Sequence, residues 1–168
     1  MDATIRTTTA SPEQGSAFAW QVHGALEAWG ARVDRKAGML LAHQGGGFLL
    51  GVTALPSHGS ATIMIALVLL LTAMCATAAA ALPVLGSAQR LARESTTNLV
   101  YFGHLRTWQP TALAAEIAQV TAHAETLMLA RQLVVLSRMN WRKHRLVQAS
   151  WAITLPAMCL GAAAVVLH

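Results

Sequence analysis

Residues 98–105 combine side chains that are suited to holding a small planar ligand. The segment contains Asn98, Tyr101, Phe102, Gly103 and His104, and it follows neither a helical nor a strand period. Aromatic rings stack on nucleobases, and polar side chains beside them form hydrogen bonds with the edge of a base. The same composition also suits a packed elbow where the chain leaves a helix. The residues alone therefore leave both a nucleotide site and a structural turn open.

A second group of candidate residues precedes the last apolar run of the chain. It is the basic cluster of Arg138, Arg142, Lys143 and Arg145, and Gln132 lies on the same expected helix. Cations at the end of a membrane span commonly anchor it beside anionic lipid. A face that also carries amide groups can instead line a polar pocket, in which a lysine or an arginine would meet an anionic ligand. A solvated face is the commoner outcome of such a pattern.

Motifs of catalysis and metal binding are absent from the sequence. It contains no Gly-x-Ser-x-Gly, no P-loop, no His-Glu-x-x-His and no Cys-x-x-Cys. Its acidic residues are few and scattered, so we expect no enzyme, no catalytic residue, no metal site and no cofactor. Cys75 and Cys159 both lie within apolar runs, and we interpret them as small buried apolar residues.

His43 and Gln44 are polar residues near the start of the first apolar run. Polar and ionisable groups at membrane depth are costly and often mark an ion or proton path. A position about one helical turn beyond Gly38 instead favours the membrane interface, where both side chains would reach water. We expect the interface position.

The elements that must position these residues are membrane helices. The chain of 168 residues is 55% hydrophobic and only 11% charged, whereas a soluble domain is typically about 25% charged. Apolar runs at residues 39–55, 61–82 and 149–167 are each long enough to cross a bilayer. The second run lacks any charge and would span roughly 33 Å as a helix. The sequence thus predicts an all-α membrane protein with about three transmembrane helices.

The remaining segments are expected to lie outside the membrane. Residues 1–11 are polar and predicted to be disordered, and residues 12–38 form an amphipathic helix that starts after Ser11. Its expected apolar face consists of Phe18, Val22, Leu26, Trp29 and Val33. Residues 85–147 form a helical sensing module, with a long helix from about Thr111 that continues toward the last span.

Small residues are spaced so that membrane helices can approach one another closely. Gly38, Ala42 and Gly46 repeat every four residues, and Gly47 and Gly51 follow with the same spacing. We expect these residues, together with Ala157 and Gly161, to lie at helix–helix contacts and to repack in a homo-oligomer.

The basic residues predict the orientation of the chain. Four precede the first apolar run and eight lie between the second and the third, which is all of the 12 Lys and Arg residues. Three spans put both segments on the same side of the membrane, and the positive-inside rule makes that side the cytoplasm. The positive-inside distribution of the Lys and Arg residues therefore accounts for the net charge of +5, and we expect no nucleic-acid partner.

With these elements in place, the sequence resembles the PycTM family, the transmembrane effectors of Pycsar antiphage defence. Residues 34–38, which lead into Met39, look like that family's Asp-x-Lys-Ala approach to its first span. Residues 98–105 are similar to its Phe-Phe-Gly-His-type segment, and residues 131–144 to its approach to the last span. The chain departs from the family where His144 follows the lysine and where three glycines interrupt the first span.

The resemblance implies a function. In such systems a partner cyclase makes cyclic CMP or cyclic UMP upon infection. The effector senses this ligand and impairs the inner membrane, which kills or arrests the infected cell. It also implies a nucleotide site between residues 98–105 and the helix of Gln132 and Lys143, with Asp34 and Lys36 nearby. Two other functions stay open. They are a holin-like or channel-forming protein without a ligand, and a membrane scaffold whose cytoplasmic helices bind a partner protein.

Overall fold

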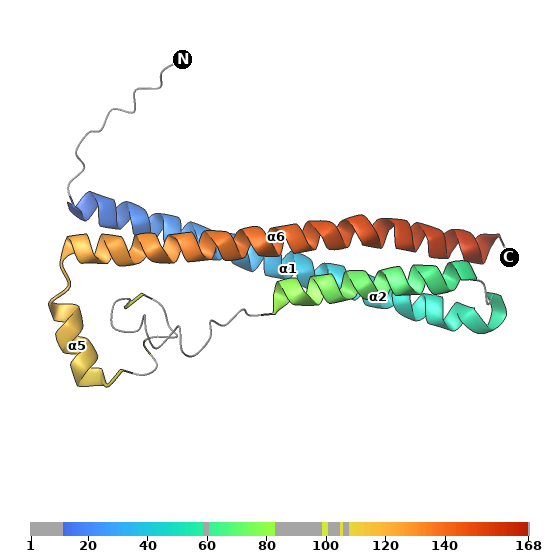
Figure 1. The fold of residues 1–168 in the computed structure, drawn as a ribbon, viewed down its shortest axis with the longest axis horizontal. Coiled ribbons are helices and arrows are strands. Elements are labelled where there is room, and N and C mark those ends of the chain that lie inside the picture. Colours follow the sequence, from blue (N-terminus) through green and yellow to red (C-terminus); the bar gives the residue numbers. More distant parts are fainter. Residues whose placement is uncertain (1–11, 59–60, 83–98, 101–104, 106–107, 168) are drawn as a thin grey trace, which may run out of the picture. The chain divides into compact units, whose positions relative to one another are not determined.

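The computed structural model describes residues 12–58, 61–82, 99–100, 105 and 108–167 (Figure 1). The expected disordered segment 1–11 lies outside these residues, as do Asn98, Tyr101, Phe102, Gly103 and His104. Within the described ranges all elements are helices: α1 (Pro12–His58), α2 (Ala61–Ala81), α5 (Pro110–Ala118) and α6 (Ala122–Val166). Three of them, α1, α2 and α6, are long and apolar enough to cross a membrane. The predicted all-α class with three such helices is confirmed.

Two of the helices are much longer than a membrane span. The amphipathic segment and the first apolar run join in the 47 residues of α1, and the basic cluster and the last apolar run join in the 45 residues of α6. Pro56 and Pro156 lie inside these helices without ending them, which membrane helices tolerate better than soluble ones. The basic cluster and the last apolar run therefore belong to one continuous helix.

The prediction that the long helix begins at about Thr111 is wrong, because α5 and α6 are separate helices. Backbone bonds from Gln119 and Val120 close the end of α5. Thr121 then begins α6, since its hydroxyl accepts the N–H of Ala124 at 3.2 Å and its carbonyl accepts the N–H of Glu125 at 2.9 Å. This arrangement is a threonine N-cap.

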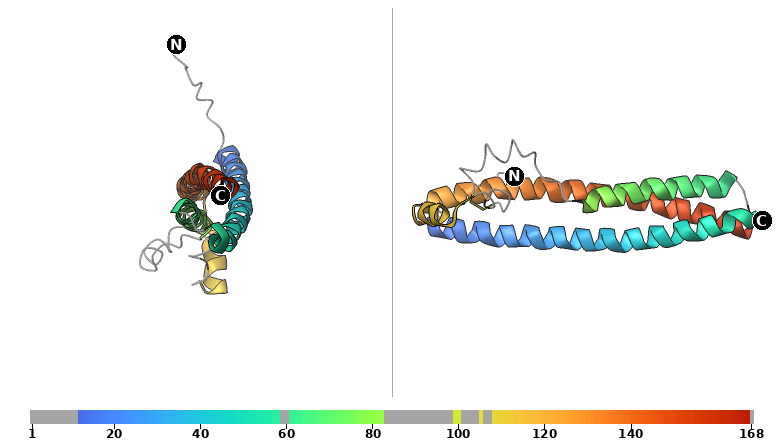
Figure 2. Two further views of the ribbon diagram at one scale, coloured as in Figure 1. Left: turned by 90° about the vertical axis from the view of Figure 1, so that its right-hand side faces the viewer. Right: turned by 90° about the horizontal axis from the view of Figure 1, so that it is seen from below.

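The chain forms two compact units, and α1 and α6 contribute to both. Unit 1 comprises Met1–Glu27 and Leu85–Ser137, and unit 2 comprises Ala28–Val84 and Arg138–His168. Unit 2 contains α2 and the parts of α1 and α6 that lie alongside it (Figure 2). In this unit α1 and α6 run in the same direction, since Asp34 contacts Lys143 and Gly47 faces Met158 further along both helices.

Buried positions recur in alternating steps of three and four along each helix of unit 2, as in the heptad pattern of coiled coils. In α2 the buried residues with this spacing are Ile63, Ala66, Leu70, Ala73, Thr77 and Ala80. In the unit 2 part of α1 they are Val33, Ala37, Leu40 and Gln44. Many of these side chains are small, which is typical of packed membrane helices.

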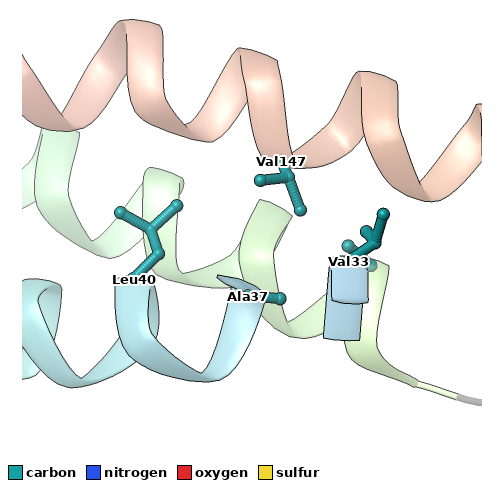
Figure 3. Packing of buried hydrophobic residues seen from close by; sticks show 5 residues of the cluster. Val33, Ala37, Leu40 and Val147 are labelled. Atoms are coloured by element: carbon teal, nitrogen blue, oxygen red, sulfur yellow. The ribbon is translucent and has the colours of Figure 1, made fainter. Parts of the chain in front are cut away.

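An apolar cluster fills the interior of unit 2 near the basic residues. It consists of Val33, Ala37 and Leu40 of α1, Ala80 of α2 and Val147 of α6 (Figure 3). Leu40 and Ala37 are each 1% exposed, so this layer is tightly packed.

The expectation that Cys75 and Cys159 are buried is wrong, because both are exposed. Phe18 and Trp29 of the apolar face of α1 are exposed as well. The interior of a narrow helix bundle has room for few large side chains, and a lipid environment imposes no cost on apolar residues that point outward.

The small residues divide into two groups. A Cβ atom at Gly51 would lie 2.7 Å from Cδ2 of Leu67, and one at Gly47 would lie 3.6 Å from Cε of Met158. At Gly38 and Gly46 a Cβ atom would meet nothing within 4 Å. Among the glycines singled out from the sequence, Gly47, Gly51 and Gly161 thus face neighbouring helices, since a Cβ atom at Gly161 would lie 3.6 Å from Cβ of Ala66. Gly38 and Gly46 lie on an outward face.

Candidate functional site

Asp34 and Lys143, both candidates from the sequence, form an ion pair in unit 2. Nζ of Lys143 donates to both carboxylate oxygens of Asp34, at 2.7 and 2.9 Å. The Lys143 side chain is 18% exposed and that of Asp34 is 46% exposed, so water reaches the pair from the side of Asp34. The carboxylate of α1 therefore fixes the position of an α6 cation, although the two residues are 109 positions apart in the sequence.

A small hollow, which we call the basic hollow, lies beside Lys143. Its volume is about 180 Å³, and it is lined by Arg138, Met139, Arg142, Lys143 and Leu146 of α6 and by Ala79, Ala80 and Leu82 at the end of α2. Arg138, Arg142 and Lys143 contribute to its wall from two adjacent turns of one helix, and the exposed wall itself is mostly apolar. Guanidinium and ammonium groups so arranged are suited to an anionic group such as a phosphate.

The other candidate residues are distributed differently. Lys36 is exposed on α1, and Gln132 is buried in unit 1, where it is 8% exposed. The structure thus brings Asp34 together with Lys143 in unit 2, whereas Gln132 belongs to unit 1.

Unit 1 has a polar contact between α1 and α6. Nε1 of Trp20 donates to Oε1 of Glu125 at 2.8 Å, and the Trp20 ring meets the ring of His23 edge-on with centroids 5.6 Å apart. Hydrogen bonds from Trp20 and then from Ser16 hold the pKa of Glu125 below its usual value, because they stabilise the carboxylate.

The most unexpected group is a polar network buried among the three helices of unit 2. It consists of Gln44 of α1, Thr77 of α2, and Ser150 and Thr154 of α6, none of which is more than 1% exposed. Nε2 of Gln44 donates to both α6 hydroxyls at 2.7 Å, and Thr77 donates to Oε1 of Gln44 at 3.0 Å. The expectation that the Gln44 side chain reaches water is therefore wrong. His43 is exposed, with Nδ1 2.9 Å from the Met39 carbonyl oxygen.

Sequence reasoning singled out Gln44 but missed its three partners. Thr77, Ser150 and Thr154 look unremarkable, because Ser and Thr are common in membrane helices, where they bond to their own backbone. The available signal was their spacing, since Ser150 and Thr154 lie four residues apart and so share one face of α6.

These features define an all-α membrane protein whose helix bundle carries a basic, anion-suited end and a polar network in its interior. The chain belongs to the PycTM family, and the family model for the Pycsar effector protein domain matches residues 18–168. Membership indicates a Pycsar antiphage effector and implies a cyclic nucleotide signal from a partner cyclase. No curated protein and no solved structure matches the chain significantly.

Proposed function

We propose that the protein is activated by a cyclic pyrimidine nucleotide, cyclic UMP or cyclic CMP, and that it then impairs the inner membrane as an abortive-infection effector. The observation that carries the proposal is the family match over residues 18–168. The basic hollow adds the chemistry, because a cyclic nucleotide has one negative charge and Arg138, Arg142 and Lys143 offer charge-assisted hydrogen bonds to it.

In the proposed site, Lys143 contacts the phosphate and Asp34 acts indirectly by holding the lysine in place. Lys36 contributes positive potential from α1 rather than a direct contact. Gln132 stays a separate candidate for a polar contact in unit 1, together with Asn98, Tyr101, Phe102, Gly103 and His104.

The orientation follows from the charges. The basic residues Arg32, Arg35 and Lys36 of α1 lie at the same end of unit 2 as the basic cluster of α6, since Asp34 and Lys143 join these segments. By the positive-inside rule this end faces the cytoplasm, where a cyclase would release its product. We also propose that the effector acts as a homo-oligomer in the bilayer.

A change at the basic hollow has a direct route into the membrane. Arg138, Arg142 and Lys143 belong to the helix that continues through the last apolar run. The ligand shifts the balance between a resting and an active arrangement of this helix by its difference in affinity for the two.

The test is binding of labelled cyclic UMP and cyclic CMP to detergent-purified protein, with cyclic AMP as control, followed by dye release from liposomes containing the protein. We expect saturable binding of one pyrimidine nucleotide and dye release that requires it. Absence of binding by protein of native helicity overturns nucleotide sensing. Binding without dye release overturns membrane impairment.

A further inference from the structure

The polar network depends on Gln44, which donates to Ser150 and accepts from Thr77, while the hydroxyl oxygens of Ser150 and Thr77 lie 2.6 Å apart. The single hydroxyl proton of Ser150 can go either to Thr77, which closes a ring with Gln44, or to the carbonyl oxygen of Ala73 at 2.9 Å. Hydrogen bonds in such a ring polarise and strengthen one another. The network joins α1, α2 and α6, and it is the main polar contact among their interior faces in the described part of unit 2.

The four side chains differ in what they would lose if the helices separated. The hydroxyls of Thr77 and Thr154 also contact carbonyl oxygens of their own helices, at 3.0 and 2.8 Å. Both polar atoms of the Gln44 amide, by contrast, bond only to α2 and α6. When α1 moves away, this amide must therefore bond to water or stay unsatisfied in an apolar environment.

A large, partly open cavity lies on the far side of the network, and the exposed residues Leu50 and Val166 belong to its lining. Its volume is about 440 Å³, its walls are almost entirely apolar, and its lining includes Gly47, Gly51, Ile63, Ala66, Ala157 and Gly161. Gly47 and Gly51 follow Gln44 along α1, and Ala157 and Gly161 follow Thr154 along α6. The cavity thus occupies the half of unit 2 that is remote from the basic cluster.

The interior of unit 2 is consequently arranged in layers. From the basic end inward come the Asp34–Lys143 pair, the apolar cluster around Leu40, the polar network and then the cavity. Ten residues separate Asp34 from Gln44 on α1, which is about 15 Å along the helix. The apolar cluster and the polar network lie between the cavity and the basic end.

We infer that Gln44, Thr77, Ser150 and Thr154 close a path for water and small ions at rest, and that the same side chains line this path when the helices separate. The inference rests on the proposed function, because it assigns a route to the proposed membrane impairment. An apolar constriction tends to exclude water even when it widens, whereas the hydroxyls of Thr77, Ser150 and Thr154 can form hydrogen bonds with incoming water. Gln44 mainly stabilises the closed arrangement, because its three bonds to α2 and α6 are lost when the helices separate.

The first experiment removes the network without any ligand. Gln44→Met keeps the length of the side chain and removes three interhelical bonds, each worth roughly a threefold change in equilibrium. We expect ion leak from nucleotide-free proteoliposomes to rise on the order of tenfold or more. Thr154→Val removes one bond from Gln44 and should raise the leak about threefold. Gln148→Met makes the same replacement at an exposed position of α6 and should leave the leak unchanged.

The second experiment measures access of water to the network. In a background with Cys75→Ser and Cys159→Ser, a charged thiol reagent is applied to Ser150→Cys and to Leu155→Cys, whose position is 55% exposed toward the outside of the bundle. We expect Cys at 150 to react only in the active state or together with Gln44→Met, and Cys at 155 to stay unreactive.

The outcomes separate the two proposals. If Gln44→Met leaves the membrane tight and Cys at 150 protected, the path does not run through the network and the inference is overturned. The same holds if nucleotide causes leak in the wild type while Cys at 150 stays protected. If Gln44→Met opens the path but the wild type binds no pyrimidine nucleotide, the inference stands and nucleotide sensing fails.

Discussion

Replacing Lys143 by alanine should weaken binding of the cyclic nucleotide while the protein stays folded. The Asp34 carboxylate that pairs with Lys143 is nearly half exposed. An exposed ion pair contributes about 0–1 kcal/mol, so the variant should remain folded. A charge-assisted hydrogen bond to a phosphate is worth about 1.5–3 kcal/mol. At about 1.4 kcal/mol per tenfold, its loss should raise the Kd for the cyclic nucleotide about 10- to 150-fold.

The assay is a titration of protein in lipid nanodiscs with labelled cyclic UMP and cyclic CMP. Arg145→Ala is the matched control, because Arg145 is exposed on the same helix and does not line the basic hollow. It removes the same charge, so it should weaken binding only through long-range electrostatics, and raising the salt concentration should remove that smaller effect.

Two results would refute the reasoning. An unchanged Kd for Lys143→Ala, in protein of native helicity, would remove Lys143 from the site. Equal losses of nucleotide affinity for Lys143→Ala and Arg145→Ala that both vanish at high salt would show that the basic end attracts the anion only through long-range electrostatics. Lys143 would then make no direct contact with the phosphate.

Two further predictions concern packing and pH. Gly51→Leu should lower the free energy of unfolding by about 1–3 kcal/mol in a denaturing-detergent titration, because its side chain would collide with Leu67, whereas Gly46→Leu should change it little; equal effects would contradict the assignment of the packing face. Because the pKa of Glu125 is lowered in the folded state, its contribution to stability is complete above the usual glutamate pKa of about 4.3 and is lost as the pH falls through the lowered value. Emission of Trp20, with the other tryptophans replaced by Phe, should report that loss, and Glu125→Gln should abolish its pH dependence.

The membrane spans could be predicted from the sequence because they rest on composition, which needs no knowledge of partners. The 21 residues of α2 carry no charge, and hydropathy alone identifies such a helix. From the sequence, Asp34 and Lys143 were expected to lie near the same ligand, but the ion pair between them was not predicted. Its geometry depends on the register between α1 and α6, which no local pattern in either helix specifies.

The packing faces could not be predicted for a different reason. In a soluble protein the buried face of a helix is its apolar face, and Cys75 and Cys159 were expected to be buried because they lie within apolar runs. In this chain both are exposed, whereas Gln44 is buried. Water no longer distinguishes the two faces of a helix that lipid surrounds, so hydropathy loses its information about what points inward.

The inward-pointing residues are indicated instead by the size and the hydrogen-bonding capacity of side chains that recur at heptad spacing. Gln44, Gly47 and Gly51 of α1 follow one another in steps of three and four, and so do Ser150, Thr154 and Ala157 of α6. Small residues let the backbones approach, and the approach brings Gln44 within 2.7 Å of two hydroxyls. Gly47 and Gly51, which lower the hydropathy of the first span, thus let α1 approach its neighbours beside the amide that these neighbours satisfy.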